Sequence, residues 1–123
     1  MTGRSSHVVL IVEHNKLLRL LTADIMKDAG FVALHASDAD EAITILESRS
    51  DIALMLTSVK MPGSTDGVGL VDIVCKRWPA IKTIIASGQR RLMGRVLSKN
   101  SRFFLKPYDA QIMISEIRLL LGP

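Results

Sequence analysis

The chain has 123 residues, 48% of them hydrophobic, and its formal net charge is +4. This length suits one compact domain, so we expect a single domain over residues 1–123. The apolar runs, such as Val8 to Val12, are too short to cross a bilayer, and the segment 1–7 lacks the apolar core of a secretory signal. The single cysteine, Cys75, excludes an internal disulfide, and we expect a cytoplasmic protein.

The first quarter of the chain predicts a buried strand followed by an amphipathic helix. Residues 7–12 are mostly apolar and β-branched without alternation, which is typical of a strand covered on both faces. Asn15 can cap the next helix, and Gly30 suits the end of that helix. The helix carries residues at spacings of three and four that we expect to form one core-facing stripe: Leu18, Leu21, Ile25 and Ala29.

Two strands and two helices are predicted in the middle of the chain. They are a strand over 31–35, a helix over about 39–47, a strand over 52–57 and a helix over about 68–77. Ser37 or Asp38 can cap the first of these helices, and Pro79 ends the second because it disfavours helical geometry in the residue before it. The loop 58–67 between them is dense in turn residues.

The last third predicts two more strands and two more helices. A strand over 81–86 precedes a weaker helix over 89–98, and a short strand follows over 102–105. Asp109 can cap the final helix. We expect the buried stripe of that helix to contain Ala110, Ile114, Ile117 and Leu121.

Five strands alternating with five helices predict a parallel sheet covered by helices on both faces. Right-handed crossovers favour a flavodoxin-like (βα)5 three-layer α/β sandwich with strand order 2-1-3-4-5. The functional edge of such a fold lies at the carboxyl ends of the strands. The residues that follow strands one, three, four and five are Glu13, His14, Asn15, Ser58, Ser87, Gly88, Lys106 and Pro107.

Four segments, in the right order and on the right strand ends, resemble the signature of bacterial response-regulator receiver domains of the chemotaxis-regulator kind. They are residues 9–13, 56–63, 85–88 and 104–108. Lys106-Pro107 is the most specific single match. The resemblance covers nearly the whole chain and implies a receiver unit, here expected to stand without an output domain.

The resemblance assigns roles to the strand-end residues. It puts Ser58 at the phosphoacceptor position, where the family has aspartate, and it puts Glu13 and His14 where the family has two adjacent acids. It implies that Ser87 is the switch hydroxyl, Lys106 the pocket lysine and Phe103 the switching aromatic. The departures at Ser58 and His14 imply a degenerate receiver.

Receiver phosphorylation is an attack by a carboxylate on phosphohistidine, and Mg²⁺ offsets the negative charge of the pocket. Ser58 offers a neutral hydroxyl instead, and His14 replaces a hard oxygen ligand with nitrogen. One carboxylate, on Glu13, then faces one cation, on Lys106. We therefore expect no phosphorylation of this pocket, no bound metal or other cofactor, no catalytic residue and no enzymatic activity.

Alternative chemistries rest on the same residues. Ser58 and His14 could form a nucleophile–base pair, but no orienting acid or oxyanion donor set is evident. Glu13 and His14 could bind Zn²⁺, but neighbours on an extended segment point apart and further ligands are lacking. Ser58 could also accept phosphate from a serine kinase, although its expected pocket is crowded. We interpret His7 and His35 as strand-end residues and Asp66 as structural. Asp51 begins the third strand at the far edge of the sheet, so it cannot substitute for the missing acceptor.

Three surfaces are candidates for a partner. Between Ile73 and Tyr108 there are nine Lys or Arg residues and no Asp or Glu, which fits either a solvated face or a surface for an acidic partner. The candidate partner face there is Arg90, Arg91, Arg95 and Lys99. The second candidate is the part of the first helix outside its predicted core stripe, where receivers meet their histidine kinase: Leu17, Leu20 and Met26. The third is an output or dimer face on the last helix around Met113 and Leu120.

Two classes of function stay open. The first is a protein-interaction module of two-component phosphorelay signalling that acts without phosphorylation, with a histidine kinase or another signalling protein as partner. The second is a basic nucleic-acid-binding domain, which is disfavoured because the chain has no recognition-helix motif and few aromatic residues. We expect no membrane partner.

Overall fold

The computed structural model describes residues 7–89 and 101–122. These residues form a five-stranded parallel sheet in the order β2-β1-β3-β4-β5. The strands are β1 (Val8–Val12), β2 (Val32–Ala36), β3 (Ile52–Ser58), β4 (Lys82–Ser87) and β5 (Ser101–Leu105). The flavodoxin-like architecture and the strand order predicted from the sequence are confirmed.

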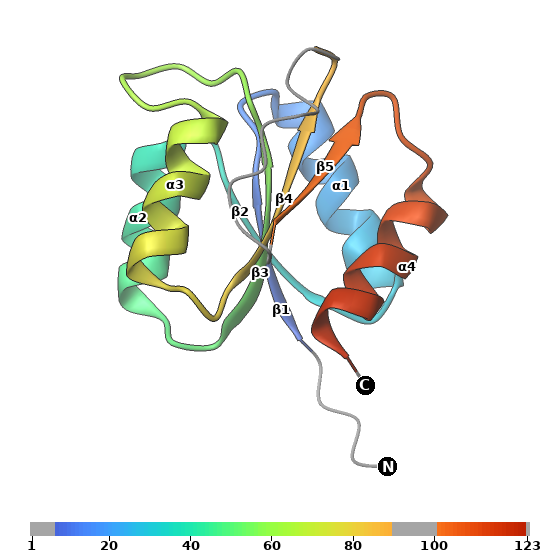
Figure 1. Cartoon of the computed structure of the whole chain (residues 1–123). Coiled ribbons are helices and arrows are strands. Elements are labelled where there is room, and N and C mark those ends of the chain that lie inside the picture. Colours follow the sequence, from blue (N-terminus) through green and yellow to red (C-terminus); the bar gives the residue numbers. More distant parts are fainter. Residues whose placement is uncertain (1–6, 90–100, 123) are drawn as a thin grey trace.

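Helices cover both faces of this sheet (Figure 1). They are α1 (Lys16–Asp28), α2 (Ala39–Ser48), α3 (Gly67–Arg77) and α4 (Ala110–Leu121). α2 and α3 lie on one face, and α1 and α4 lie on the other. The helix expected over 89–98 falls, apart from Gln89, outside the described residues.

Each of these four helices begins at a side chain that accepts a hydrogen bond from a backbone N–H of the first turn. Asn15 caps α1 and Asp109 caps α4, as predicted, and Asp38 rather than Ser37 caps α2. Asp66 caps α3 by accepting from the Gly69 N–H at 2.9 Å. Asp66 is therefore structural, as expected.

The core lies on both faces of the three inner strands, β1, β3 and β4. β1 is buried along its whole length, and its alternating residues point to opposite layers. Leu10 packs with Leu70 beneath α2 and α3. Val9 packs with Met26 and Met113 beneath α1 and α4. Because these strands are buried on both faces, their sequences are continuous runs of apolar residues.

The core-facing stripe of α1 differs from the predicted one. Leu18, Leu21 and Ile25 are 47%, 49% and 36% exposed, whereas Ala23 and Met26 are buried. Ala23 and Met26 pack in the core beneath α1, while Leu18, Leu21 and Ile25 face the space before α4. Apolar residues cover more than one side of this helix, so periodicity alone selected the wrong side. Met26 is core and does not belong to a partner surface.

The last helix confirms one prediction and corrects another. Ile114 and Ile117 are buried, as the stripe predicts. Met113 is fully buried as well, so it cannot form an output or dimer face, because it lies on the same side of the helix as Ile117 one turn later. The exposed apolar residues of α4 are instead Ile112 and Leu119.

The rotation of α1 can be tested by truncating one residue on each side of it. Met26→Ala removes a fully buried side chain, so we expect the free energy of unfolding to fall by about 2–5 kcal/mol. Leu21→Ala removes a half-exposed side chain and should cost roughly half of that or less. Urea denaturation of both variants measures the difference. A larger loss for Leu21→Ala would contradict the observed rotation.

Candidate functional site at the carboxyl ends of the strands

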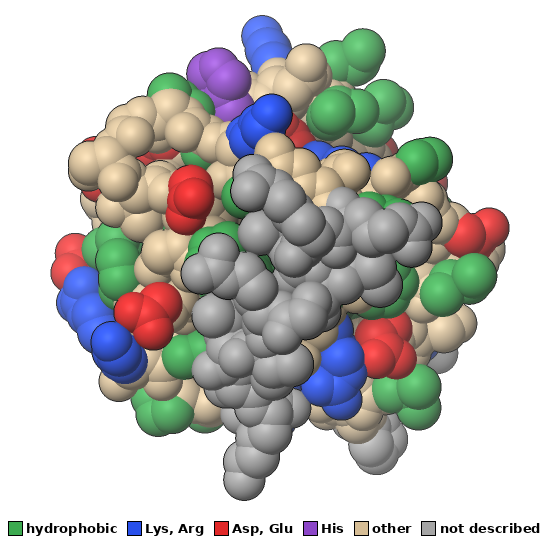
Figure 2. All heavy atoms as spheres, turned by 45° about the horizontal axis from the view of Figure 1, so that its top comes forward, with side chains coloured by type: hydrophobic (Ala, Val, Ile, Leu, Met, Phe, Trp, Pro, Cys, Tyr) green, Lys and Arg blue, Asp and Glu red, His purple; other side chains and the backbone are tan. Residues whose placement is uncertain are grey.

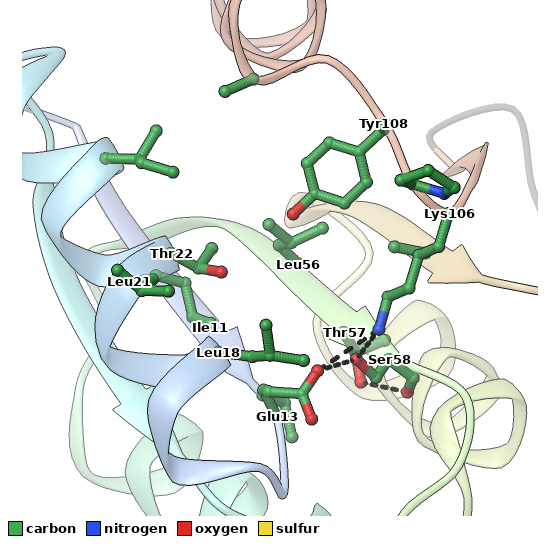
Figure 3. Close-up of a pocket in the computed structure, with 15 residues that line it drawn as sticks. Ile11, Glu13, Leu18, Leu21, Thr22, Leu56, Thr57, Ser58, Lys106 and Tyr108 are labelled. Atoms are coloured by element: carbon green, nitrogen blue, oxygen red, sulfur yellow. Dashed lines mark hydrogen bonds and ion pairs between the residues drawn. The ribbon is translucent and has the colours of Figure 1, made fainter.

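Three polar side chains from three strand ends meet at the carboxyl edge of the sheet (Figure 3). Glu13 follows β1, Ser58 ends β3 and Lys106 follows β5. Val12 lies opposite Thr57 in the register of β1 and β3, so the next residue of each strand falls side by side. The fold therefore brings together three of the predicted site residues, the most distant pair being 93 positions apart in the chain.

These three side chains form a closed hydrogen-bonded set. Lys106 Nζ donates to Ser58 Oγ at 2.9 Å and to Glu13 Oε1 at 3.4 Å, and the Ser58 hydroxyl donates to the Glu13 carboxylate. The Glu13 side chain is only 13% exposed, whereas Lys106 is 34% exposed. A carboxylate withdrawn from water needs a cation and hydrogen-bond donors, and Lys106 and Ser58 supply both.

The titration of Glu13 reflects these contacts. Burial by itself would raise the pKa of Glu13. Hydrogen bonds from the Ser58 hydroxyl and from the Asn15 N–H at 2.9 Å, together with the charge of Lys106, outweigh burial and hold the pKa below its ordinary value of 4.5. Glu13 is therefore an anion at neutral pH, and the set carries one negative and one positive charge.

His14 stands apart from this set. It is exposed on the turn between β1 and α1. The Arg19 guanidinium donates to the backbone carbonyls of Glu13 at 3.0 Å and His14 at 3.3 Å, which fixes the turn. Within residues 7–89 and 101–122, no group of three or more His, Cys, Asp or Glu side chains is placed to hold a metal ion.

Of the two switch residues implied by the resemblance, Ser87 lines the site and Phe103 packs against the core. Ser87 is buried and lines the same hollow as Glu13, Ser58 and Lys106. Its hydroxyl accepts from the Gln89 N–H at 3.0 Å, and its carbonyl accepts from the Lys106 N–H at 2.8 Å. Phe103 is half-buried against the core beneath α2 and α3. The backbone of Ser87 thus positions the lysine.

Gly67 supports the site and was not singled out from the sequence. A Cβ atom on Gly67 would stand 1.9 Å from the Ser58 carbonyl oxygen, and the Gly67 N–H donates to the Val59 carbonyl at 2.8 Å. The first turn of α3 therefore packs directly on the backbone that carries Ser58. Because glycine is a poor helix former, its position directly after the capping Asp66 was the sequence signal that could have drawn attention to this residue.

The predicted basic face of Arg90, Arg91, Arg95 and Lys99 lies outside the described residues. Figure 2 looks onto the carboxyl edge of the sheet, and in the part of this view that is coloured, side chains of both charge signs are interspersed. Asp51 lies directly before β3, at the opposite edge of the sheet from Ser58, as expected, and forms an ion pair with Arg49 at 2.7 Å. On α1, Leu17 and Leu20 are exposed, as a contact surface requires.

The contact between Gly67 and Ser58 predicts a large effect of one methyl group. Gly67→Ala should lower the free energy of unfolding by about 1–3 kcal/mol, because backbone atoms must move to admit the Cβ atom. Gly88→Ala is the matched control, since a Cβ atom there meets nothing within 4 Å. Urea denaturation compares the two. Equal stability of the two variants would contradict the close approach of α3 to Ser58.

The lowered pKa of Glu13 predicts a pH-dependent contribution to stability. Because the folded pKa lies below the unfolded value, this contribution is complete above about pH 5 and is lost as the pH falls through the folded pKa. Glu13→Gln should therefore flatten the fall in unfolding free energy below about pH 5. Urea denaturation across a pH series measures this, and identical slopes for wild type and variant would rule out the coupling.

Comparisons with known proteins agree with this geometry. The sequence profile of the family "Response regulator receiver domain" matches residues 9–118. The transcriptional regulatory protein PdtaR of Mycobacterium tuberculosis is 31% identical over 118 residues, which are 93% of this chain and 56% of that protein. A putative NtrX-like response regulator of Rickettsia bellii is 34% identical over 80 residues, covering 65% of this chain and 17% of that protein. The chain thus spans only part of the length of these relatives.

Solved structures share the fold. A CheY-like receiver domain protein from Methanospirillum hungatei superposes with a TM-score of 0.84 at 25% identity, covering 95% of this chain and 94% of that one. The receiver domain of an HD-domain protein from Pseudomonas fluorescens gives 0.85 at 21% identity, covering 95% of each chain. No helix in the described part of the chain is long and apolar enough to span a membrane. Profile, relatives and fold together place the chain in the response regulator receiver domain family of two-component signalling, whose members interact with histidine kinases and other signalling proteins.

Proposed function

We propose that this receiver domain is a protein-interaction module of two-component signalling that acts without phosphorylation at the end of β3. The observation that carries the proposal is the closed set of Glu13, Ser58 and Lys106. Ser58 occupies the phosphoacceptor position that the resemblance implies. Its side chain is a hydroxyl, which donates a hydrogen bond to Glu13. The partner is a histidine kinase or another signalling protein.

The chemistry of Ser58 supports this proposal. A receiver acceptor attacks phosphohistidine as a carboxylate and becomes an acyl phosphate, and a neutral hydroxyl cannot form that product. Lys106 donates a hydrogen bond to Ser58 Oγ, so it does not act as a base toward that hydroxyl. Ser58 is also buried, which opposes access by a separate kinase.

The donor set does not fit the Mg²⁺ ion that the family implies. Mg²⁺ requires oxygen ligands in octahedral geometry and is held by carboxylates in proteins. In the described part of the site the carboxylate is Glu13, and it is already paired with Lys106. His14 would bring nitrogen, and its side chain is exposed on the adjacent turn. The pair of charges balances without a metal.

The proposed partner surfaces follow from charge and exposure. The basic stretch with Arg90, Arg91, Arg95 and Lys99 favours an acidic partner, and this surface stays a prediction from the sequence. A protein is preferred to a nucleic acid because the sequence shows no recognition-helix motif and few aromatic residues. The exposed Leu17 and Leu20 of α1 offer a second surface. A nucleic-acid-binding role has no further support from the described residues.

Treatment with acetyl phosphate and Mg²⁺, followed by intact mass spectrometry, tests the proposal. We expect the wild-type chain to gain no phosphoryl group, because no carboxylate stands at the end of β3. The matched variant His14→Asp/Ser58→Asp restores the acidic set and should gain one. A receiver domain with the full acidic set, treated in parallel, shows that the reagent is active.

An adduct on the wild-type chain that disappears in Ser58→Ala would refute the proposal. Its stability then identifies the bond, since an acyl phosphate is hydrolysed readily and a serine phosphate is not. The same treatment with a purified histidine kinase as the donor gives an independent second measurement.

A further inference from the structure

β2 is an outer strand of the sheet, and among the described residues its backbone pairs with β1 alone. The Val32 N–H donates to the His7 carbonyl at 2.9 Å, and the Ala36 carbonyl accepts from the Glu13 N–H at 3.0 Å. Because backbone groups alternate sides along a strand, the even-numbered residues of β2 bond to β1. The odd-numbered residues therefore direct their N–H and C=O groups away from the sheet.

The open stretch of this edge is Ala33 and His35. It is closed at one end by the Phe31 N–H, which donates to a carbonyl of α1, and at the other by the Ser37 N–H, which donates to a carboxylate of α2. Between these points the outward N–H and C=O groups have no partner among the described residues. A strand laid along β2 would bond to all of them, so this edge fits an extended backbone as its partner.

β2 lacks the features with which outer strands usually resist such pairing. Its sequence, Val-Ala-Leu-His-Ala, contains no charged residue and no proline, and its register with β1 continues without a bulge. The other outer strand, β5, carries Arg102, which forms an ion pair with Glu116 at 3.0 Å. Val32 is 42% exposed and His35 is exposed as well, so the edge of β2 is open to a second strand.

The open stretch is complementary to itself. A two-fold axis through Leu34, perpendicular to the sheet, places β2 antiparallel to β2 of a second copy. Ala33 then faces His35 of the second copy, and each such pair exchanges two N–H···O bonds, which satisfies every open group. On the opposite face of the strand, Leu34 meets its own counterpart and Val32 faces Ala36 of the second copy. These contacts are apolar, and no like charges stand opposite each other.

We infer that two copies of this chain associate through β2, antiparallel about Leu34, so that one sheet continues through both. A second copy brings the neutral sequence and the register that the open stretch requires. The contact is short, with five residues of β2 from each copy, so we expect a weak dimer with a Kd on the order of 100 μM. The inference goes beyond the proposed function and does not rest on it, because association is measured without any phosphorylation.

Sedimentation velocity of the full chain, over a concentration series that brackets this Kd, tests the association. We expect the average mass to rise toward that of a dimer. His35→Pro removes an outward N–H and no bond to β1, so it should weaken the association by at least about tenfold. His35→Ala is the matched control, because it keeps the N–H and should associate like the wild type. Val32→Glu, which would bury a charge between the copies, serves as a second variant in case His35→Pro does not fold.

The register is tested by disulfide capture in a Cys75→Ser background, which removes the single natural cysteine. Leu34→Cys should crosslink into a dimer under mild oxidation, because opposed residues of an antiparallel pair lie within the Cα separation of a disulfide. Val32→Cys is the matched control on the same face of the strand. It should not crosslink, because its counterpart lies four positions along the partner strand, about 13 Å away.

Three results would overturn the inference. If the wild type stays a monomer throughout the series, no second copy pairs with β2. If His35→Pro and His35→Ala associate equally, while Leu119→Lys at an exposed position of α4 abolishes the association, the dimer uses α4 instead. If Val32→Cys crosslinks as readily as Leu34→Cys, the two-fold axis does not pass through Leu34.

Discussion

The ion pair between Lys106 and Glu13, with the Ser58 hydroxyl held between them, determines the character of the functional edge of this molecule. The three groups come from three strands and meet because parallel strands end at the same edge of the sheet. Together they compensate charge and satisfy the buried Glu13 carboxylate. The two charges of this edge therefore balance each other, which supports the proposal that it holds no metal ion.

Several features of the fold maintain this arrangement. The backbone of Ser87 fixes Lys106 through its carbonyl, and Gly67 allows α3 to pack on the carbonyl of Ser58. The turn that carries Glu13 is held by Arg19 and by the cap at Asn15. The polar set thus rests on backbone contacts made by β4, by α3 and by the start of α1, which is how a site is kept in one geometry.

The two faces of the sheet differ in how completely their helices close. Beneath α2 and α3 the core is continuous, whereas between α1 and α4 the large side chains of α1 face an open groove. The groove ends at the same three polar side chains that mark the strand ends (Figure 3).

The sequence by itself determined the sheet, the strand order, the helix caps and the group of residues at the strand ends. Those follow from short-range patterns: continuous apolar strands, Asn15 and Asp109 before helices, and polar residues directly after strands. Only the tertiary structure decided which flank of α1 is buried, that Met113 is core, that Gly67 touches Ser58, and that a groove exists. Each of these depends on how closely two elements approach. That distance is set by contacts between side chains that are far apart in the chain, and the periodicity of one helix carries no information about such contacts.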